Sequence, residues 1–307
     1  MSPAFRATGR RLVRLWSEGL VSRLTSESQF ALLRILGSNL GVSAHLLQTT
    51  NGIFLLPVQD GTVLRHVAKE ADWEKGIRRF LETALRHGGT FLDVGAHVGM
   101  FSCGMAKLQH VNVIAFEPVP GNYELLKLNS KLNDVASNLL LISEAVGDSN
   151  SRVRMRISDT NSGDNRIVNE KFQPTRDSFN SLPEIVDAAQ CTLDTALRDV
   201  PLQFPVVLKV DVQGAEFSVL RGSRQVLRDT DTLVLEVALE DARGNRSLLS
   251  ELFAILECHF RSAAFLDAQG NGAVKWTSLE EIKAWTYELA SRAANREVNL
   301  VFRKASP

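Results

Sequence analysis

Residues 90–99 read TFLDVGAHVG, a short apolar run that passes directly into a turn with two glycines. The run 91–94 is typical of a buried strand, and residues 99–108 have the spacing of a helix. Gly95 and Gly99 carry no Cβ, so the backbone of the turn can approach a ligand closely. A strand that turns into a helix in this way is the place where doubly wound folds bind their cofactors. A glycine-rich turn without any ligand is the alternative.

The alternation of short apolar runs and helical stretches continues along the chain. Because the apolar runs are almost uninterrupted, both faces of the strands are expected to be covered, which is typical of a parallel sheet in an α/β fold. The last run is expected to form an antiparallel strand at an edge. The further expected strands are 111–116, 138–146, 206–212, 232–239 and 298–303, and the further expected helices are 121–132, 216–227 and 247–257.

The glycine turn lacks the spacing G-x-G-x-x-G of a dinucleotide site, in which a helix N-terminus holds a pyrophosphate. It begins instead with the carboxylate of Asp93, which would repel a pyrophosphate but suits a ligand with an ammonium or sulfonium group. These residues favour S-adenosyl-L-methionine over NAD(P) as the cofactor. An NAD(P) oxidoreductase on the same topology and a non-catalytic binding module are the alternatives.

Acidic residues also follow the later strands. Glu117-Pro118 comes after the second strand, where a carboxylate can accept hydrogen bonds from ribose hydroxyls. Glu144-Ala145 follows the third strand, at the position expected for the adenine. Asp211 ends the fourth strand and shares a face of it with Lys209. The residues expected to contact the cofactor are Asp93, Gly95, Ala96, His97, Gly99, Glu117, Pro118, Glu144, Ala145 and Asp211.

These motifs, in this order, resemble the FkbM family of S-adenosylmethionine-dependent methyltransferases. The resemblance covers about residues 73–238 and rests on FLDVGAHVGMFS (91–102), AFEPVPGNYELLKLN (115–129), AVGD (145–148), NSG (161–163), CTLD (191–194), LKVDVQGAE (208–216) and LVLEV (233–237). It implies a class I methyltransferase fold, which is a Rossmann-like, mostly parallel, seven-stranded sheet with helices on both faces. It also implies O-methylation of a hydroxyl group on a sugar, a glycan or a secondary metabolite. The chain departs from the family pattern at His97, where asparagine is more usual, and at Gln213, where glutamate is more usual.

Methylation of an aliphatic hydroxyl is helped by a general base within hydrogen-bond reach. Asp211 is the first candidate, Glu216 the second, and His97 the third because an imidazole titrates near neutral pH. Each also has an ordinary explanation, as a turn carboxylate, a helix N-terminal charge and a structural histidine respectively. Asp211 alone cannot hold a divalent metal and no second ligand stands at a suitable spacing, so no metal is expected, although the sequence leaves open whether one takes part.

The chain has 307 residues, enough for one large domain or two small ones. We expect a helical extension over residues 1–50, rich in arginine, and a methyltransferase domain over residues 51–307. The basic segment predicts either a helix packed on the domain or a peripheral contact with an anionic membrane. Residues 149–201 lack periodicity and are expected to form a substrate loop region, and a hairpin is expected around Asp60-Gly61.

The composition excludes several classes of protein. A formal net charge of +0, from 35 Lys+Arg and 35 Asp+Glu, argues against a dedicated nucleic-acid binder. The three cysteines are too far apart for a disulfide framework or a Cys-rich zinc site, and all three are expected in the core. No apolar run reaches the ~18 residues of a membrane span. These features fit a cytoplasmic protein, possible membrane contact of the basic segment aside. The small-molecule or glycan acceptor is expected only from the family resemblance, and the sequence leaves the oligomeric state open.

Overall fold

The computed structural model describes residues 44–57, 60–158, 161–168, 184–239, 246–292 and 297–304. The predicted basic helix and its membrane contact fall on the first 43 residues, which lie outside the described residues. In the described part of the chain, no helix is both long enough and apolar enough to cross a bilayer.

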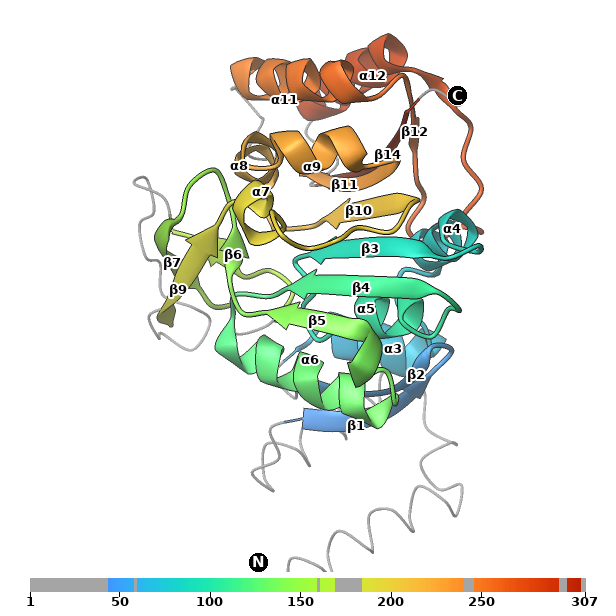
Figure 1. Ribbon diagram of the computed structural model, residues 1–307, viewed down its shortest axis with the longest axis vertical. Coiled ribbons are helices and arrows are strands. Elements are labelled where there is room, and N and C mark those ends of the chain that lie inside the picture. Colours follow the sequence, from blue (N-terminus) through green and yellow to red (C-terminus); the bar gives the residue numbers. More distant parts are fainter. Residues whose placement is uncertain are drawn as a thin grey trace, which may run out of the picture.

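The centre of the molecule is a sheet with the strand order β13-β12-β14-β11-β10-β3-β4-β5 (Figure 1). Neighbouring strands from β11 to β5 run parallel, whereas β14, β12 and β13 each pair antiparallel with their neighbours. The predicted mostly parallel α/β sheet is therefore confirmed. Its strands are β3 Gly89–Val94, β4 Val111–Phe116, β5 Leu139–Ile142, β10 Val206–Val210, β11 Thr232–Ala238, β12 Ser262–Phe265, β13 Thr277–Ser278 and β14 Glu297–Arg303.

Two details of the predicted sheet are wrong. The sheet has eight strands in the described residues rather than seven, because the two-residue β13 adds an outer antiparallel strand. The last strand, β14, is antiparallel as expected, but it lies between β11 and β12 rather than at an edge. The short strand β12 was missed because its sequence, SAAF, is too short and too small-chained to give a strand pattern.

The order of the parallel strands reverses between β3 and β10. The chain moves outward from β3 to β4 and β5, then returns to the other side of β3 to form β10. In open α/β sheets, ligands bind in the crevice at such a switch point, beyond the carboxyl ends of the strands. The glycine turn after β3 and the carboxylate after β10 therefore stand on either side of the expected binding crevice.

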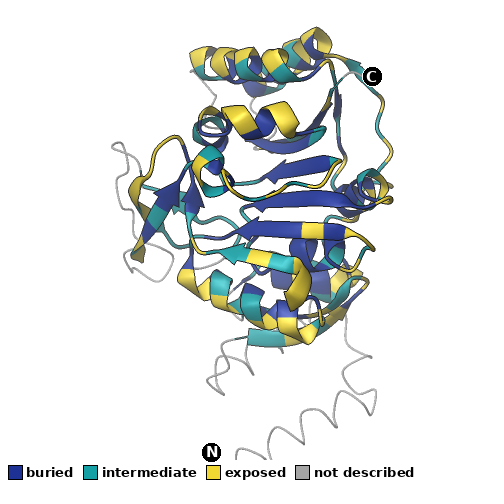
Figure 2. Cartoon of the chain, viewed as in Figure 1, coloured by how far each residue is buried: buried dark blue, intermediate teal, exposed yellow. Residues whose placement is uncertain are grey.

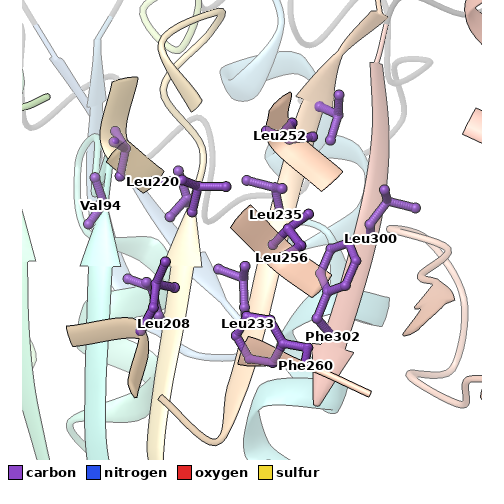
Figure 3. Close-up of a cluster of buried hydrophobic side chains, with 14 of the residues drawn as sticks. Val94, Leu208, Leu220, Leu233, Leu235, Leu252, Leu256, Phe260, Leu300 and Phe302 are labelled. Carbon is purple, nitrogen blue, oxygen red and sulfur yellow. The ribbon is translucent and has the colours of Figure 1, made fainter. Parts of the chain in front are cut away.

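Helices cover both faces of the sheet, so the central strands β3, β4, β10 and β11 are almost entirely buried, whereas β5 at the edge is partly exposed (Figure 2). On one face, the strand residues Leu208, Leu233 and Phe302 pack against Leu256 of α11 and Phe260, which directly follows this helix (Figure 3). The opposite face packs against α3, α4 and α5. The helices are α3 Val63–Glu70, α4 Lys75–Ala84, α5 Met100–Met105, α6 Pro120–Leu132, η2 Ala136–Asn138, α7 Leu193–Ala196, α8 Glu216–Arg221, α9 Arg224–Asp229, α11 Arg246–His259 and α12 Leu279–Ser291.

The segment before the sheet differs from the prediction. β1 (Ala44–Thr49) and β2 (Gly52–Pro57) form an antiparallel hairpin, so the predicted helical extension does not continue to residue 50. The hairpin expected around Asp60 is also wrong. The Asp60 carboxylate instead accepts hydrogen bonds from the backbone of Thr62 and Val63 at 3.0 and 2.7 Å, and so starts α3. An Asp-Gly pair serves a hairpin turn and a helix start equally well, and the local sequence does not distinguish them.

Part of the predicted loop region 149–201 forms a second, four-stranded sheet with the order β6-β9-β7-β8. Its strands are β6 Ala145–Val146, β7 Ser151–Arg156, β8 Arg166–Ile167 and β9 Ile185–Cys191. The predicted strand 138–146 is therefore divided between two sheets, with a break before Glu144. The predicted helix 216–227 is also divided, into α8 and α9, where Gly222 packs against the backbone of Gly147.

Two of the three cysteines are buried as expected, but Cys258 is exposed on α11.

Candidate functional site

A cavity of about 560 Å³ lies at the carboxyl ends of the parallel strands, which is within the size range of small-molecule sites. Asp93, Gly99 and Glu216, which the sequence also singled out, lie outside its lining. Six further residues line the cavity that the sequence did not identify as site residues: Trp73, Glu74, Ser162, Lys209, Glu236 and Glu297. The predicted residues that line the cavity are Gly95, Ala96, His97, Glu117, Pro118, Glu144, Ala145 and Asp211.

The two glycines of the turn are required for contacts within the protein. Gly95 has a φ of +85°, and a Cβ on it would lie 1.8 Å from the backbone oxygen of Asp211. Gly99 has a φ of +86°, and its Cβ would lie 2.3 Å from Leu126. Both glycines are therefore needed for close contacts within the protein, and the expectation that they also let a ligand approach stays a prediction. Gly95 lets β3 and β10 come together where the cavity begins.

Glu117 connects the turn to the end of β4. Its Oε2 accepts a hydrogen bond from the backbone N–H of His97 at 2.9 Å, and its Oε1 accepts one from Val119 at 2.9 Å. Burial raises the pKa of Glu117 to about 7, although the backbone hydrogen bonds favour the charged form. The carboxylate is thus held rigidly at the cavity, and each oxygen keeps a further lone pair for a ligand hydroxyl.

Asp93 and Lys209 form the buried floor beneath the cavity. They are register partners on β3 and β10, and Lys209 Nζ lies 4.0 Å from Asp93 Oδ1 and 4.9 Å from the centre of the Phe101 ring. Asp93 is completely buried, its Oδ2 accepts a hydrogen bond from Ser102 at 2.5 Å, and its Oδ1 has no hydrogen-bond partner among the described residues. Burial raises the pKa of Asp93.

Asp211 and Glu236 lie side by side at the ends of β10 and β11. Lys209 Nζ donates to Asp211 Oδ2 at 2.8 Å, and Gln213 Nε2 donates both to Asp211 Oδ1 at 3.1 Å and to Glu236 Oε2 at 2.7 Å. Although burial opposes it, the Lys209 ammonium holds the pKa of Asp211 at about 2. Burial and the Asp211 charge raise the pKa of Glu236 to about 11. At neutral pH the pair therefore consists of a charged Asp211 and a neutral Glu236.

This arrangement weakens the case for Asp211 as the general base. Both of its oxygens already accept hydrogen bonds, and a carboxylate with so low a pKa takes up a proton poorly. Glu216 is less suited still, because it lies outside the cavity lining and its Oε1 accepts a hydrogen bond from the backbone of Gly214 at 2.8 Å. That contact fits the helix N-terminal role of Glu216.

His97 links the turn to two distant segments. Its Nε2 lies 2.6 Å from Ser162 Oγ, and Ser162 in turn donates a hydrogen bond to Asp60 at the start of α3. Since the hydroxyl proton goes to Asp60, Nε2 must carry the proton that it shares with Ser162. Burial lowers the pKa of His97, against the effects of the Asp60 and Asp211 charges. The histidine is thus a neutral connector that holds residues 161–163 over the glycine turn.

No three His, Cys, Asp or Glu side chains in the described ranges are arranged as ligands of a metal ion.

The raised carboxyl pKa values predict how stability depends on pH. Glu117, Glu74 and Glu236 have folded pKa values of about 7, about 8 and about 11, all above the ordinary value of 4.5. Between about pH 5 and pH 8 the folded chain therefore binds more protons than the unfolded chain, so stability falls as the pH rises. Glu236→Gln mimics the neutral acid, so it is expected to raise the urea midpoint of unfolding at pH 8 and to make stability depend less on pH. The exposed control Glu251→Gln is expected to change neither. An unchanged slope in Glu236→Gln would show that Glu236 is ionised.

A family model and curated relatives both identify the chain as a methyltransferase. The family model described as the methyltransferase FkbM domain matches residues 93–266. The chain is 29% identical over 152 residues to methyltransferase sdnD of Sordaria araneosa, covering 43% of this chain and 59% of that protein. It is 27% identical over 184 residues to the hexuronic acid methyltransferase AglP of Haloferax volcanii, covering 58% of this chain and 68% of that protein. The chain thus spans less than two thirds of the length of sdnD.

Among solved structures, the chain is similar to the methyltransferase FkbM from Methylobacillus flagellatus. The two share 15% identity and a TM-score of 0.41, over 70% of this chain and 43% of the other.

Proposed function

Since the chain belongs to the FkbM family of S-adenosylmethionine-dependent methyltransferases, we propose that it transfers a methyl group to a hydroxyl group of a sugar or glycan. The observation that carries this proposal is the lining of the cavity, in which one indole and several carboxyl groups stand together. Trp73 offers a flat apolar surface, and Glu74, Gln213 and Glu236 offer hydrogen-bonding groups. An aromatic face beside such groups suits a sugar, which has an apolar C–H face and a rim of hydroxyls. The likeness to AglP, a hexuronic acid methyltransferase, supports the same class of acceptor.

The residues of the cavity fit S-adenosylmethionine, which supplies an electrophilic methyl group on a sulfonium when it is bound. Two observations support the fit. Glu117 and Asp211 line the cavity and Asp93 is buried beneath it beside Lys209; a cationic ligand would favour the charged forms of Asp93 and Glu117, whose pKa values burial raises. Glu117 is held by two backbone N–H groups in the position where it can accept hydrogen bonds from ribose hydroxyls.

The chain's own residues can contribute to the reaction in three ways. Asp211 stays charged and can stabilise positive charge near the end of β10. The 161–163 segment, held by His97 and Ser162, lies at the cavity lining and can limit the access of water. Trp73 and Gln213 can orient the acceptor so that its oxygen, the methyl carbon and the sulfur lie on one line.

The proposal predicts which cofactor binds. Calorimetry is expected to show S-adenosylmethionine and its demethylated product binding, and NAD not binding. Mass spectrometry of a panel of methyl glycosides, neutral and acidic, incubated with protein and S-adenosylmethionine is expected to show the addition of one methyl group to a hydroxyl. Binding of NAD alone would contradict the proposal. Binding of S-adenosylmethionine with methylation of amines or thiols but of no hydroxyl would keep the family and reject the acceptor.

A further inference from the structure

Glu74 stands out because its backbone is strained and its side chain does not serve the helix that it precedes. It lies at the N-cap position of α4 in the left-handed region, with φ 42° and ψ 55°, a conformation that is unfavourable for a residue with a Cβ. Its side chain makes no capping hydrogen bond to α4. It lines the cavity instead. Such strain persists only where the surrounding structure holds it, and it is common at functional sites.

A buried ion pair holds the turn that carries Glu74. Asp72 accepts hydrogen bonds from the backbone N–H of Trp73 at 2.9 Å and from Arg78 of α4 at 3.1 and 2.7 Å. Both partners of this pair are buried. On the other side, the backbone N–H of Gly76 donates to Ala268 at 2.8 Å. The turn is therefore fixed at both sides of Glu74, and the direction of its side chain is built into the fold.

The Glu74 carboxylate differs from the other carboxyl groups around the cavity in its hydrogen bonds. Glu117 and Asp211 have both oxygens engaged, and Glu236 accepts from Gln213. Within the described ranges, the Glu74 side chain has neither a hydrogen bond nor an ion pair, although its backbone carbonyl accepts a hydrogen bond from Arg78 at 3.1 Å. It is thus a cavity carboxylate with both oxygens available to a ligand.

The charges that face Glu74 come from three strands. Lys209 and Asp211 lie on and after β10, Glu236 lies on β11, and Glu297 begins β14. Burial and the Asp211 charge raise the pKa of Glu74 to about 8, and Lys209 opposes them. A carboxyl group in this range is far better matched to proton transfer at neutral pH than Asp211 is.

We propose that Glu74 is the general base of the reaction and takes the proton of the acceptor hydroxyl. The inference rests on the proposed methylation of a hydroxyl. As the acceptor oxygen forms its bond to the methyl carbon, the carbon–sulfur bond breaks and its electron pair stays on sulfur. The hydroxyl proton passes to the Glu74 carboxylate and leaves to solvent after the product departs. Asp211 then serves as a fixed negative charge, and Glu74 as the group that changes protonation state.

The test compares Glu74→Gln with Glu70→Gln, an exposed residue at the end of α3 that pairs with Lys69. With a glycoside that wild type methylates as the substrate, the turnover of Glu74→Gln is expected to fall ~10²–10⁴-fold. Its affinity for S-adenosylmethionine, measured by calorimetry, is expected to stay within about threefold of wild type. Glu70→Gln is expected to match wild type in both. In wild type, kcat/KM, which reports the ionisation of groups in the free protein, should rise about tenfold per pH unit below pH 8 and level off above it, because only the charged carboxylate accepts a proton. Glu74→Gln should lack this limb. Normal turnover or a retained limb in Glu74→Gln would overturn the proposal.

A second measurement needs no acceptor. Carbon-13 NMR of the protein labelled at glutamate carboxyl groups is expected to show one resonance that titrates near pH 8 and is absent in Glu74→Gln. In Asp211→Asn this titration should move to lower pH, since the charge that raises the pKa is gone. A pKa of Glu74 near the ordinary glutamate value of 4.5 would reject Glu74 as the general base even if the protein methylates a hydroxyl. Failure of wild type to methylate any hydroxyl, with the titration as expected, would instead reject the proposed function.

Discussion

Gly95→Ala is expected to abolish binding of S-adenosylmethionine and to lower the melting temperature of the protein. The new Cβ would lie 1.8 Å from the backbone oxygen of Asp211, and the φ of +85° is unfavourable for any residue with a Cβ. Moving the backbone of Asp211 away from Gly95 would break a hydrogen bond, because the N–H of Asp211 donates to the carbonyl of Val94 at 3.0 Å. β3 and β10 would separate at the switch point, where the cavity begins. We expect affinity to fall at least ~100-fold, equivalent to ~2.8 kcal/mol.

The control for this change is Gly121→Ala. A Cβ at Gly121 would meet nothing within 4 Å, and the residue lies in the first turn of α6. Alanine there should leave affinity unchanged and stability equal or slightly higher, since it favours the helix. Calorimetry and thermal unfolding of both variants decide the matter. Wild-type affinity in Gly95→Ala would mean that the turn after β3 does not form the binding site.

Lys209→Met is expected to be among the most destabilising single substitutions in the chain. Lys209 is 3% exposed, and its Nζ lies 2.8 Å from Asp211 and 4.0 Å from Asp93. Apolar side chains such as Val207 and Val234 make up most of the rest of this face of the sheet. Burial alone would lower the pKa of Lys209, but the carboxylates of Asp211, Asp93 and Glu74 outweigh it and raise the pKa. Removing one partner of a buried ion pair leaves uncompensated charge and typically costs ~3–5 kcal/mol. Urea unfolding should show a loss of this order.

Two comparisons separate this electrostatic effect from lost packing. Lys127→Met removes an exposed lysine that pairs with Glu124 at 2.9 Å, and it should cost less than ~1 kcal/mol. The double variant Lys209→Met with Asp211→Asn should be less destabilised than the sum of its single variants, because the orphaned charge has been removed as well. Equal stability of Lys209→Met and wild type would show that the buried carboxyls become neutral at little cost.

Gly95→Ala and Lys209→Met both act on the contact between β3 and β10. Gly95 sets how closely β3 and β10 approach, and Lys209 neutralises the carboxylates that this approach brings together. The cavity therefore depends on a floor in which several acidic groups are buried around one ammonium. This explains why its carboxyl pKa values spread so widely, from about 2 at Asp211 to about 11 at Glu236.

The sequence alone determined the parts of this protein that depend on neighbours along the chain. Apolar runs located the parallel strands β3, β4, β10 and β11, because a strand buried on both faces needs an uninterrupted run. The residues that follow these strands were identified as site residues, and Gly95, Glu117 and Asp211 do line one cavity. Carboxyl ends of parallel strands meet at one edge of a sheet whatever the order of the strands, so this inference needed no coordinates.

Only the tertiary structure decided what each of these groups can do. Ser162 and Glu236 lie in the motifs NSG and LVLEV, but neither motif shows by itself which atoms its side chain meets in the cavity. Glu74 precedes the sheet, and no motif marks it as part of the cavity. The protonation of Asp211 depends on Lys209, Gln213 and Glu236 together. Desolvation and charge act through space and not along the chain. The proposed roles of Glu74 as base and Asp211 as fixed charge therefore depend on how closely β10, β11 and the turn before α4 lie to one another.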